Sequence, residues 1–347
     1  MAVEQVEVDG SLGEGGGQIL RTAVAFSVIR QVPVRVVKIR AGREAPGLKR
    51  QHVSALSVLA SIFGGTLEGA SEGSATVRFD PGRQQVEVHS LDMGTAASIS
   101  LVLQAVIPAV ALGGSKLKLS LAGGTDVPWS PTFDYFRSVV IGGYRAIGIE
   151  AEVQVHRRGY YPKGGGAVTA EVSGSRPPLP LDMTERKAIT GATLASRCGM
   201  LPRAVAERQA EAASDRLSRS GIALDACEVT EERSSSPGTS VTISSVGEGC
   251  FVGADALGAR GKPAERVGLE AAERFVLAAE SGACMDVNVA DMLIPLLSLA
   301  PRPSRVRVPA VTPHLESGLR LAELFTSCTW SVENGRRGTV VSVFPRG

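Results

Sequence analysis

A repeated order of strands and helices is the feature that most limits the folds open to this sequence. Apolar residues alternate along short segments and recur at helical spacing along longer ones, in the order β-α-β-α-β-β. This order is completed three times, over roughly 1–85, 86–175 and 284–347, with the first strand of the third pass least clear. Recurrence of one supersecondary unit predicts repeats that bury a shared core.

The predicted elements of the three passes share these periodicities. Helices are predicted over residues 16–30, 46–65, 95–114, 131–149, 289–300 and 313–325. Strands are predicted over residues 3–10, 32–42, 74–82, 84–90, 116–127, 150–159, 165–174, 304–311, 328–335 and 338–345.

Residues 185–283 interrupt the repetition with a different order of elements. A proline-rich stretch, 173–182, precedes them and marks a domain boundary. Strands are predicted at 186–196, 225–232 and 238–245, and helices at 202–219 and 263–281. We therefore expect an α/β (α+β) protein with one domain over 1–184 and 284–347 and a smaller α/β insert domain over 185–283.

Composition excludes several classes of protein. The sequence is 44% hydrophobic, which suits a large core and argues against disorder. The apolar run at 98–114 is near the lower limit for a membrane span, and the N-terminus does not resemble a signal peptide. Five widely spaced cysteines form neither a zinc pattern nor a disulfide framework, and the net charge is only +2. We expect a cytoplasmic protein, and the number of subunits, including a homo-oligomer, stays open.

A glycine-rich segment, "GSLGEGGGQILRTA" (10–23), directly follows a predicted strand and begins a helix. Five of the eight residues 10–17 are glycine. A tight turn explains this, because glycine tolerates positive φ and close backbone approach. An anion cradle at a helix N-terminus also explains it. The segment alone does not decide between the two.

Common nucleotide-binding motifs are missing from the sequence. A P-loop ending at "GK" (261–262) would need glycine at Ala256 and a hydroxyl residue at Pro263. A dinucleotide fingerprint beginning at Gly13 would need its third glycine at Gln18. Any phosphate chemistry must therefore use another kind of site.

Basic residues and two histidines supply candidates for such a site. The segment 40–50 carries Arg40, Arg43, Lys49 and Arg50 against a single glutamate, which also suits an ordinary solvated surface. His52 lies beside them at a helix start, and His314 lies at the start of another helix. His89 and His156 fit surface positions on alternating strands. Since no histidine has zinc-ligand spacing, we expect no zinc site.

A second triple glycine lies in "RGYYPKGGGAV" (158–168), between two predicted strands. A hairpin or bulge accounts for it locally. Its recurrence in two units makes a purely local explanation less complete.

Taken together, these segments resemble the RNA 3′-terminal phosphate cyclase family. The matching stretches occur in the family's order: "DGSLGEGGGQILRTA", "RAGREAPGLKRQH", "SLVLQAVIPA", "GGTDVPWSP" and "RGYYPKGGGAV". The resemblance implies that the repeated unit is similar to the C-terminal domain of bacterial translation initiation factor three. The same unit builds the enolpyruvyl transferases, which use six copies.

The resemblance also implies an enzyme with ligase-type nucleotidyl transfer, ATP as cofactor and RNA as partner. His314 is implied to attack the α-phosphate of ATP and to carry AMP to an RNA 3′-phosphate. The adjacent 2′-hydroxyl then closes a 2′,3′-cyclic phosphate and releases AMP. Imidazole suits this role because it is nucleophilic near neutral pH.

Further site residues are implied by the same matching. Glu14 is implied to bind a divalent metal, Mg or Mn. The phosphate and RNA end are implied to contact Arg21, Arg40, Arg43, Gln51 and His52, with Gln104 nearby. The adenosine is implied to contact Pro131, Tyr135 and Asp291.

The sequence departs from the family pattern at two places, and one alternative function stays open. The helix of His314 begins "HLESG" where members commonly have threonines, and Asn288 replaces an aromatic residue or histidine. A non-catalytic branch of the family assists ribosome assembly and lacks the histidine, so His314 favours the enzyme. Three units instead of six argue against an enolpyruvyl transferase.

Overall fold

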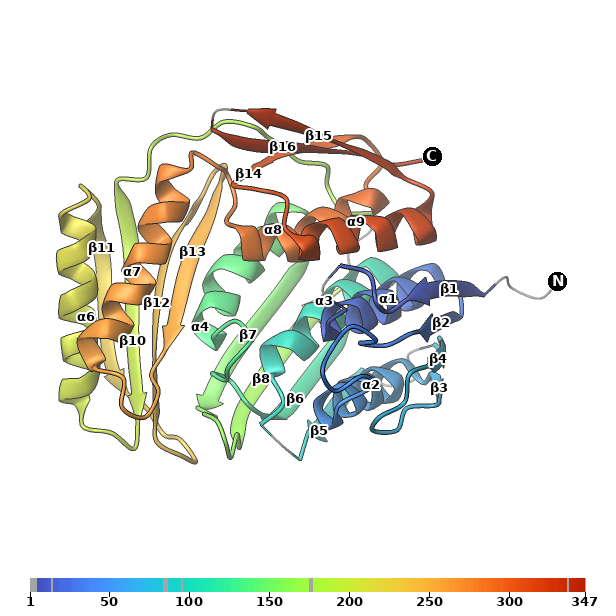
Figure 1. Cartoon of the computed structure of the whole chain (residues 1–347), viewed down its shortest axis with the longest axis horizontal. Coiled ribbons are helices and arrows are strands. Elements are labelled where there is room, and N and C mark those ends of the chain that lie inside the picture. The colour runs from blue at the N-terminus through green and yellow to red at the C-terminus, as the bar shows by residue number, and fades with distance from the viewer. Residues whose placement is uncertain are drawn as a thin grey trace.

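The computed structural model describes residues 5–13, 15–83, 87–94, 96–174, 177–335 and 337–346. Its described strands form four sheets of four strands each, and helices lie against each sheet (Figure 1). The predicted mixture of helices and strands is confirmed. The likeness of the repeats to an initiation-factor domain stays a prediction.

The first sheet is built from the N-terminal repeat. Its strands have the order β1-β2-β4-β3, with β1 and β2 parallel and the other pairs antiparallel. The elements are β1 (Val6–Asp9), α1 (Gly17–Arg30), β2 (Val34–Val37), α2 (Arg50–Phe63), β3 (Thr66–Glu68) and β4 (Val77–Asp80). The strand β3, which has only three residues, was not predicted.

The second sheet repeats this order as β5-β6-β8-β7. Its strands are β5 (Val88–Asp92), β6 (Leu117–Gly123), β7 (Glu150–Arg157) and β8 (Gly166–Ser173). Its helices are α3 (Ile99–Gly113) and a continuous helical stretch of α4 (Phe133–Tyr135), η1 (Phe136–Val140) and α5 (Ile141–Ala146). The strand predicted at 84–90 overlaps β5 and so opens this sheet, although residues 84–86 lie outside the described part.

The third sheet has the order β15-β16-β14-β9, the same arrangement once more. Its elements are β9 (Asp182–Met183), α8 (Val287–Leu293), η2 (Ile294–Leu299), β14 (Ser304–Val308), α9 (Pro313–Thr326), β15 (Thr329–Gly335) and β16 (Gly338–Phe344). The outermost strand, β9, pairs parallel with β14 although some 120 residues of chain separate them. The inserted segment therefore enters after the first strand of the third repeat.

The fourth sheet lies entirely within the inserted segment, at the left of Figure 1. Its order is β11-β10-β12-β13, and α6 and α7 pack on it with a core of their own. The elements are β10 (Gly191–Gly199), α6 (Arg203–Ser218), β11 (Ala223–Glu231), β12 (Gly238–Gly247), β13 (Cys250–Leu257) and α7 (Ala264–Glu280). The last strand, β13, was not predicted.

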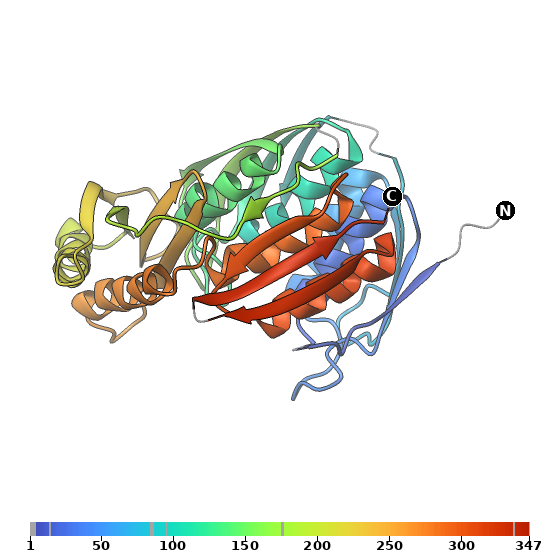
Figure 2. The same ribbon diagram turned by 90° about the horizontal axis from the view of Figure 1, so that it is seen from above.

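The helices of the three repeats share one hydrophobic core (Figure 2). The central helix is α3, whose apolar residues are buried on nearly all sides, which explains why Ser100 and Gln104 are the only polar residues between Ile99 and Gly113. Phe26 of α1 stacks on Phe325 of α9 with ring centroids 5.7 Å apart. Within the described part of the chain, no helix combines the length and apolarity needed to cross a bilayer.

Candidate active site

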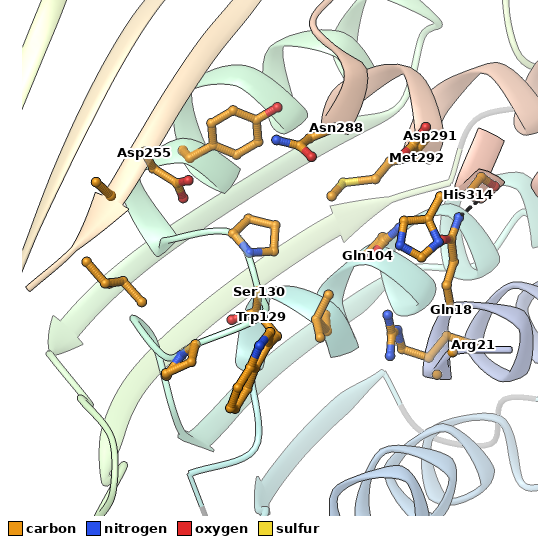
Figure 3. A pocket seen from close by; sticks show the side chains of 18 of the residues that line it. Gln18, Arg21, Gln104, Trp129, Ser130, Asp255, Asn288, Asp291, Met292 and His314 are labelled. Carbon is orange, nitrogen blue, oxygen red and sulfur yellow. Dashed lines mark hydrogen bonds between the residues drawn. The ribbon is translucent and has the colours of Figure 1, made fainter. Parts of the chain in front are cut away.

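A cleft of about 640 Å³ lies where the repeats meet the inserted segment (Figure 3). The start of α1 and the start of α9 form one end of it, and β13 and α7 of the insert form the other. Its lining residues are Gly16, Gly17, Gln18, Arg21, Gln51, His52, Leu101, Gln104, Pro128, Trp129, Ser130, Pro131, Tyr135, Asp255, Ala256, Leu257, Lys262, Glu270, Arg274, Asn288, Asp291, Met292 and His314.

His314 reaches this cleft from the first turn of α9 and is half-buried. The helix begins with Pro313, and the Thr312 hydroxyl caps it by accepting from the Leu315 N–H at 2.9 Å. The same hydroxyl donates to Asp291 Oδ1 at 2.5 Å, which ties the cap to α8. Gln18 Nε2 of α1 donates to the His314 carbonyl at 3.2 Å. The backbone that carries the imidazole is therefore fixed from two sides.

The glycine-rich segment allows α1 to approach α9 and α2 closely. Gly13 has φ +53°, and a Cβ there would lie 2.2 Å from Ser317 Oγ of α9. A Cβ at Gly17 would lie 2.8 Å from His52 Nε2. Side chains at either position would separate the helices that form the cleft. The close-approach explanation therefore holds here, while Glu14 lies outside the described residues.

Arg21 and His52 lie beside these glycines and line the same part of the cleft. The Arg21 Nε is buried with no acceptor among the described residues. Burial lowers the Arg21 pKa to about 10, so the guanidinium stays charged at neutral pH. Burial, then the charges of Arg21, Arg40 and Lys49, lower the His52 pKa to about 4. An unpaired buried donor beside a neutral imidazole favours an anionic ligand.

The orientation of His52 follows from its backbone contact. Its Nδ1 accepts a hydrogen bond of 3.1 Å from the Lys49 N–H. In the neutral ring this assigns the proton to Nε2, the nitrogen that faces the glycine-rich segment. His52 can therefore donate one hydrogen bond into the cleft.

Two predicted arginines do not line the cleft. Arg40 is buried and its Nη1 donates to the carbonyls of Ala45 and Gly47, at 2.7 and 3.0 Å. Its guanidinium therefore holds the 40–47 loop together. It affects the cleft only because its positive charge helps to lower the pKa of His52. Arg43 is exposed on that loop. The other described candidates, namely Arg21, Gln51, His52, Gln104, Pro131, Tyr135, Asp291 and His314, all line the cleft.

Tyr135 is among the residues around the cleft, but it is almost fully buried and its hydroxyl is already engaged. The hydroxyl donates to Asp286 Oδ1 at 2.7 Å. Asp286 also accepts from the N–H groups of Asn288, Val289 and Gly253, at 2.8, 3.1 and 2.9 Å. Burial nevertheless raises the Asp286 pKa to about 6. This network fixes Asn288 at the start of α8, where it faces the cleft.

The inserted segment supplies cleft residues that the sequence analysis missed. Asp255 of β13 accepts from the Thr132 N–H at 2.6 Å, and its burial raises its pKa. Lys262 and Arg274 both pair with Glu270, each at 2.5 Å, so one carboxylate is shared by two cations and the trio keeps one positive charge. The available signal was a single carboxylate within the otherwise apolar strand "CFVGADAL".

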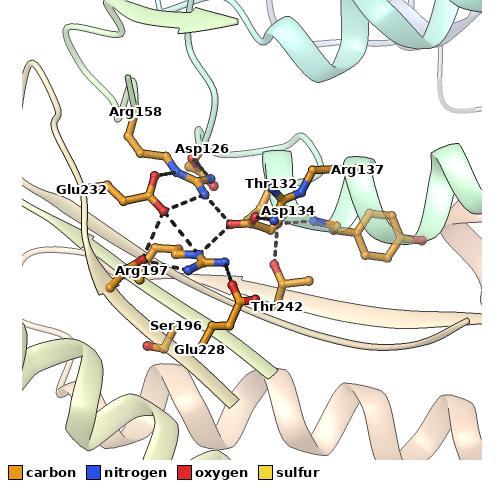
Figure 4. Close-up of polar contacts among 12 residues, drawn as sticks. Asp126, Thr132, Asp134, Arg137, Arg158, Ser196, Arg197, Glu228, Glu232 and Thr242 are labelled. Carbon is orange, nitrogen blue, oxygen red and sulfur yellow. Dashed lines mark hydrogen bonds and ion pairs between the residues drawn. The ribbon is translucent and has the colours of Figure 1, made fainter. Parts of the chain in front are cut away.

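A buried ion network joins the second repeat to the insert (Figure 4). At its centre Arg158, 1% exposed, comes from the "RGYYPKGGG" segment. It pairs with Asp126 at 3.2 Å, Asp134 at 2.6 Å and Glu232 at 2.7 Å. Arg197 of β10 also pairs with Asp134, at 3.3 Å. The second triple glycine thus belongs to a junction that positions the insert and not to the cleft.

The side chains present offer no metal site within the described residues. There, no group of three or more His, Cys, Asp and Glu side chains is arranged to hold an ion.

Fold and cleft together define an α/β protein of repeated units whose cleft presents a histidine and an arginine to an anionic ligand. The family model described as RNA 3′-terminal phosphate cyclase matches residues 12–332. The chain belongs to this family.

Relatives of similar length support the assignment. The chain is 40% identical over 346 residues to the RNA 3′-terminal phosphate cyclase of Caldivirga maquilingensis, covering 98% of each chain. It is 42% identical over 341 residues to that of Thermococcus gammatolerans, covering 97% of this chain and 98% of the relative.

Among solved structures, the enolpyruvyl transferase NikO from Streptomyces tendae aligns with 99% of this chain. The chain spans 48% of that protein, at 9% identity and a TM-score of 0.38. Neither fold nor activity is transferred from a likeness this weak.

Proposed function

We propose that this protein converts an RNA 3′-phosphate to a 2′,3′-cyclic phosphate at the expense of ATP, through a covalent histidine–AMP intermediate. The observation that carries the proposal is that His314 and Arg21 line the same cleft. Family membership supports the overall activity, and the relatives named above carry the corresponding name.

The first step forms the intermediate. A ring nitrogen of His314 attacks the α-phosphorus of ATP, the bond from that phosphorus to the bridging oxygen breaks, and pyrophosphate leaves. Arg21 stabilises negative charge on the phosphoryl oxygens, and His52 Nε2 donates a hydrogen bond to them. The N-terminus of α9, which carries His314, adds a favourable dipole.

Two further transfers complete the reaction. An oxygen of the RNA 3′-phosphate attacks the phosphorus held by His314, and the P–N bond breaks. The 3′-phosphate is now bonded to AMP, which is a good leaving group. The 2′-hydroxyl then attacks the 3′-phosphorus, its proton is lost, and AMP departs. An unactivated phosphate monoester offers no comparable leaving group, which is why adenylylation must come first.

The remaining cleft residues are assigned to binding. Pro131 offers a flat surface for the adenine, the buried Tyr135 ring supports that wall of the cleft, and Asp291 and Gln104 offer polar atoms for the ribose and phosphates. Gln51 lies beside Arg21 and His52 at the phosphate end. Arg40 acts as a positioning residue through the 40–47 loop, and Arg43 on that loop contacts the RNA backbone.

Labelling with α-³²P-ATP tests the intermediate directly. Wild-type protein is expected to retain acid-labile radioactivity after denaturation, and His314→Ala to retain none. His156→Ala is the matched control, because His156 is exposed on β7 and bonds to Thr169 Oγ1 at 2.9 Å. An unlabelled wild type that still binds RNA would instead support the non-catalytic ribosome-assembly alternative. Labelling with and without EDTA tests the implied metal requirement.

A further inference from the structure

Trp129 is held in solvent at the edge of the cleft. Its side chain is 95% exposed, although it lines the cleft with Pro128, Ser130 and Pro131. Only one other tryptophan occurs in the sequence, Trp330, which packs half-buried against the core. Exposing so large an apolar surface gains no folding free energy, and tryptophan is enriched where a binding surface meets water.

The backbone at Trp129 is in the left-handed region, with φ +62°. A bulky side chain rarely adopts this conformation, and strained positions of this kind cluster at ligand-binding sites.

The segment around Trp129 is anchored on both sides. Val127 is buried, and the Ser130 hydroxyl donates to its carbonyl at 2.8 Å. Thr132 is fully buried, donates its N–H to Asp255 at 2.6 Å and shares a hydrogen bond of 2.9 Å with Thr242. The indole is therefore presented by a rigid turn, which limits the entropy lost when a ligand stacks on it.

We propose that Trp129 is a stacking platform for the terminal base of the RNA whose 3′-phosphate binds at Arg21 and His52. In Figure 3 Trp129 and Arg21 lie along one edge of the cleft, while Asp255 and Asn288 lie along the other. Proteins recognise single-stranded ends by stacking unpaired bases on aromatic rings. This inference rests on the proposed function, which supplies the RNA end.

The RNA base fits Trp129 better than the adenine of ATP does. An almost wholly exposed ring suits a polymer that arrives from solvent, whereas a mononucleotide is held mainly by enclosing walls. Stacking also accepts any base, because every base has a π-face. The chemistry requires only a 3′-phosphate and a 2′-hydroxyl, so we expect cyclisation with little dependence on the last base.

Tryptophan fluorescence of the Trp330→Phe protein tests the stacking, because Trp129 is then the only tryptophan. An oligoribonucleotide with a 3′-phosphate is expected to quench the emission on binding. The same oligonucleotide with an abasic last residue keeps the phosphate and is expected to cause little quenching. Equal quenching by both, or saturable quenching by ATP alone, would overturn the proposal.

Cyclisation kinetics supply the second measurement. Trp129→Ala is expected to raise the KM for RNA about 10- to 100-fold with kcat little changed, and Trp129→Phe to restore most of the affinity. For the abasic RNA the substitution should leave KM unaltered. An unchanged KM for ordinary RNA in Trp129→Ala contradicts the proposal. Failure of wild-type self-labelling would refute the proposed function instead, while the fluorescence comparison would still report on base stacking.

Discussion

The side-chain amide of Gln18 donates a hydrogen bond of 3.2 Å to the backbone carbonyl of His314, joining residues 296 positions apart. The bond links the first turn of α1 to the first turn of α9. The Phe26–Phe325 stack links the same two helices further along. The glycine-rich segment and the candidate nucleophile are therefore parts of one arrangement, in which α1 fixes the position of His314.

Removal of this bond should slow formation of the intermediate. Gln18→Ala releases one constraint on the backbone of His314, and a hydrogen bond of this kind contributes about 1 kcal/mol. If that energy orients the imidazole, self-labelling should slow about 5-fold. The rate of ³²P incorporation under single-turnover conditions measures this. Gln154→Ala, on the exposed side of β7, is the control. Equal rates in both variants would show that Gln18 does not orient His314.

Asp286 should make folding stability fall as pH rises. Its pKa is about 6 in the folded protein against an ordinary value of 3.8, so the folded state binds the proton more tightly. Its contribution is complete below pH ~4 and lost by pH ~6, with a size on the order of 3 kcal/mol. Asp286→Asn lacks this titration. The free energy of unfolding of this variant minus that of wild type should therefore increase as pH rises from ~4 to ~6. Urea titrations at several pH values measure this difference.

His52 should have the opposite effect over nearly the same range. Its pKa falls to about 4 from an ordinary value of 6.5, so the unfolded state binds the proton more tightly. The contribution is complete above pH ~6.5 and lost as pH falls to ~4. Relative to wild type, the free energy of unfolding of His52→Gln should therefore decrease as pH rises. If the free energies of unfolding of the variant and of wild type, measured with urea, changed equally with pH, the neutral state assigned to His52 would be contradicted.

Elements with strong local patterns could be predicted from the sequence. The apolar run of α3 and the alternation in β6 and β8 follow directly from burial on one or more faces. The strand β9 could not be identified as part of the third repeat. Its two residues pair with β14 across the whole insert, and no local signal encodes a partner that distant.

Residues of the candidate site could be predicted where they lie in segments with a recognisable motif. Arg21 and Gln104 lie in segments that resemble the family, His314 was assigned by the same resemblance although its helix departs from the family pattern, and all three line the cleft. The location of Arg40 was not predictable, because its hydrogen bonds to the 40–47 loop depend on how that loop folds. Asp255 was missed because the insert carries no recognisable motif, and only tertiary packing brings β13 against the 127–132 segment.

Loss of Arg158 should destabilise the protein strongly. Arg158→Met leaves the carboxylates of Asp126 and Asp134 buried with less compensating charge, and breaking a buried pair costs about 3–5 kcal/mol. Urea unfolding measures the loss. Arg203→Ala is the matched control, because the exposed Arg203–Glu207 pair contributes at most about 0.5 kcal/mol.

The same substitution should loosen the insert. Arg158 contacts both the second repeat and Glu232 of the inserted segment, so proteolysis within 185–283 should accelerate in Arg158→Met. A destabilisation below 1 kcal/mol, with unchanged proteolysis, would show that the junction is held by packing alone.

The protein should be more stable with glycine than with alanine in place of Trp129. Both substitutions remove the indole, but only alanine keeps a Cβ in the left-handed conformation at φ +62°. That conformation costs an L-residue about 1–2 kcal/mol, partly offset by the greater freedom of glycine in the unfolded chain. Trp129→Gly should therefore unfold at a higher urea concentration than Trp129→Ala, by about 0.5–1 kcal/mol in free energy.

Measuring RNA affinity as well as stability for Trp129→Gly and Trp129→Ala separates the effect of backbone strain from the effect of losing the indole. Both variants should lose affinity for the RNA end alike, because neither carries an aromatic ring. If Trp129→Gly is also as stable as wild type, the tryptophan contributes nothing to the free energy of folding. Its loss of RNA affinity would then show that the strained residue serves binding. If alanine were as stable as glycine, the turn would relax without strain. The left-handed backbone would then give no support to a role in presenting the indole.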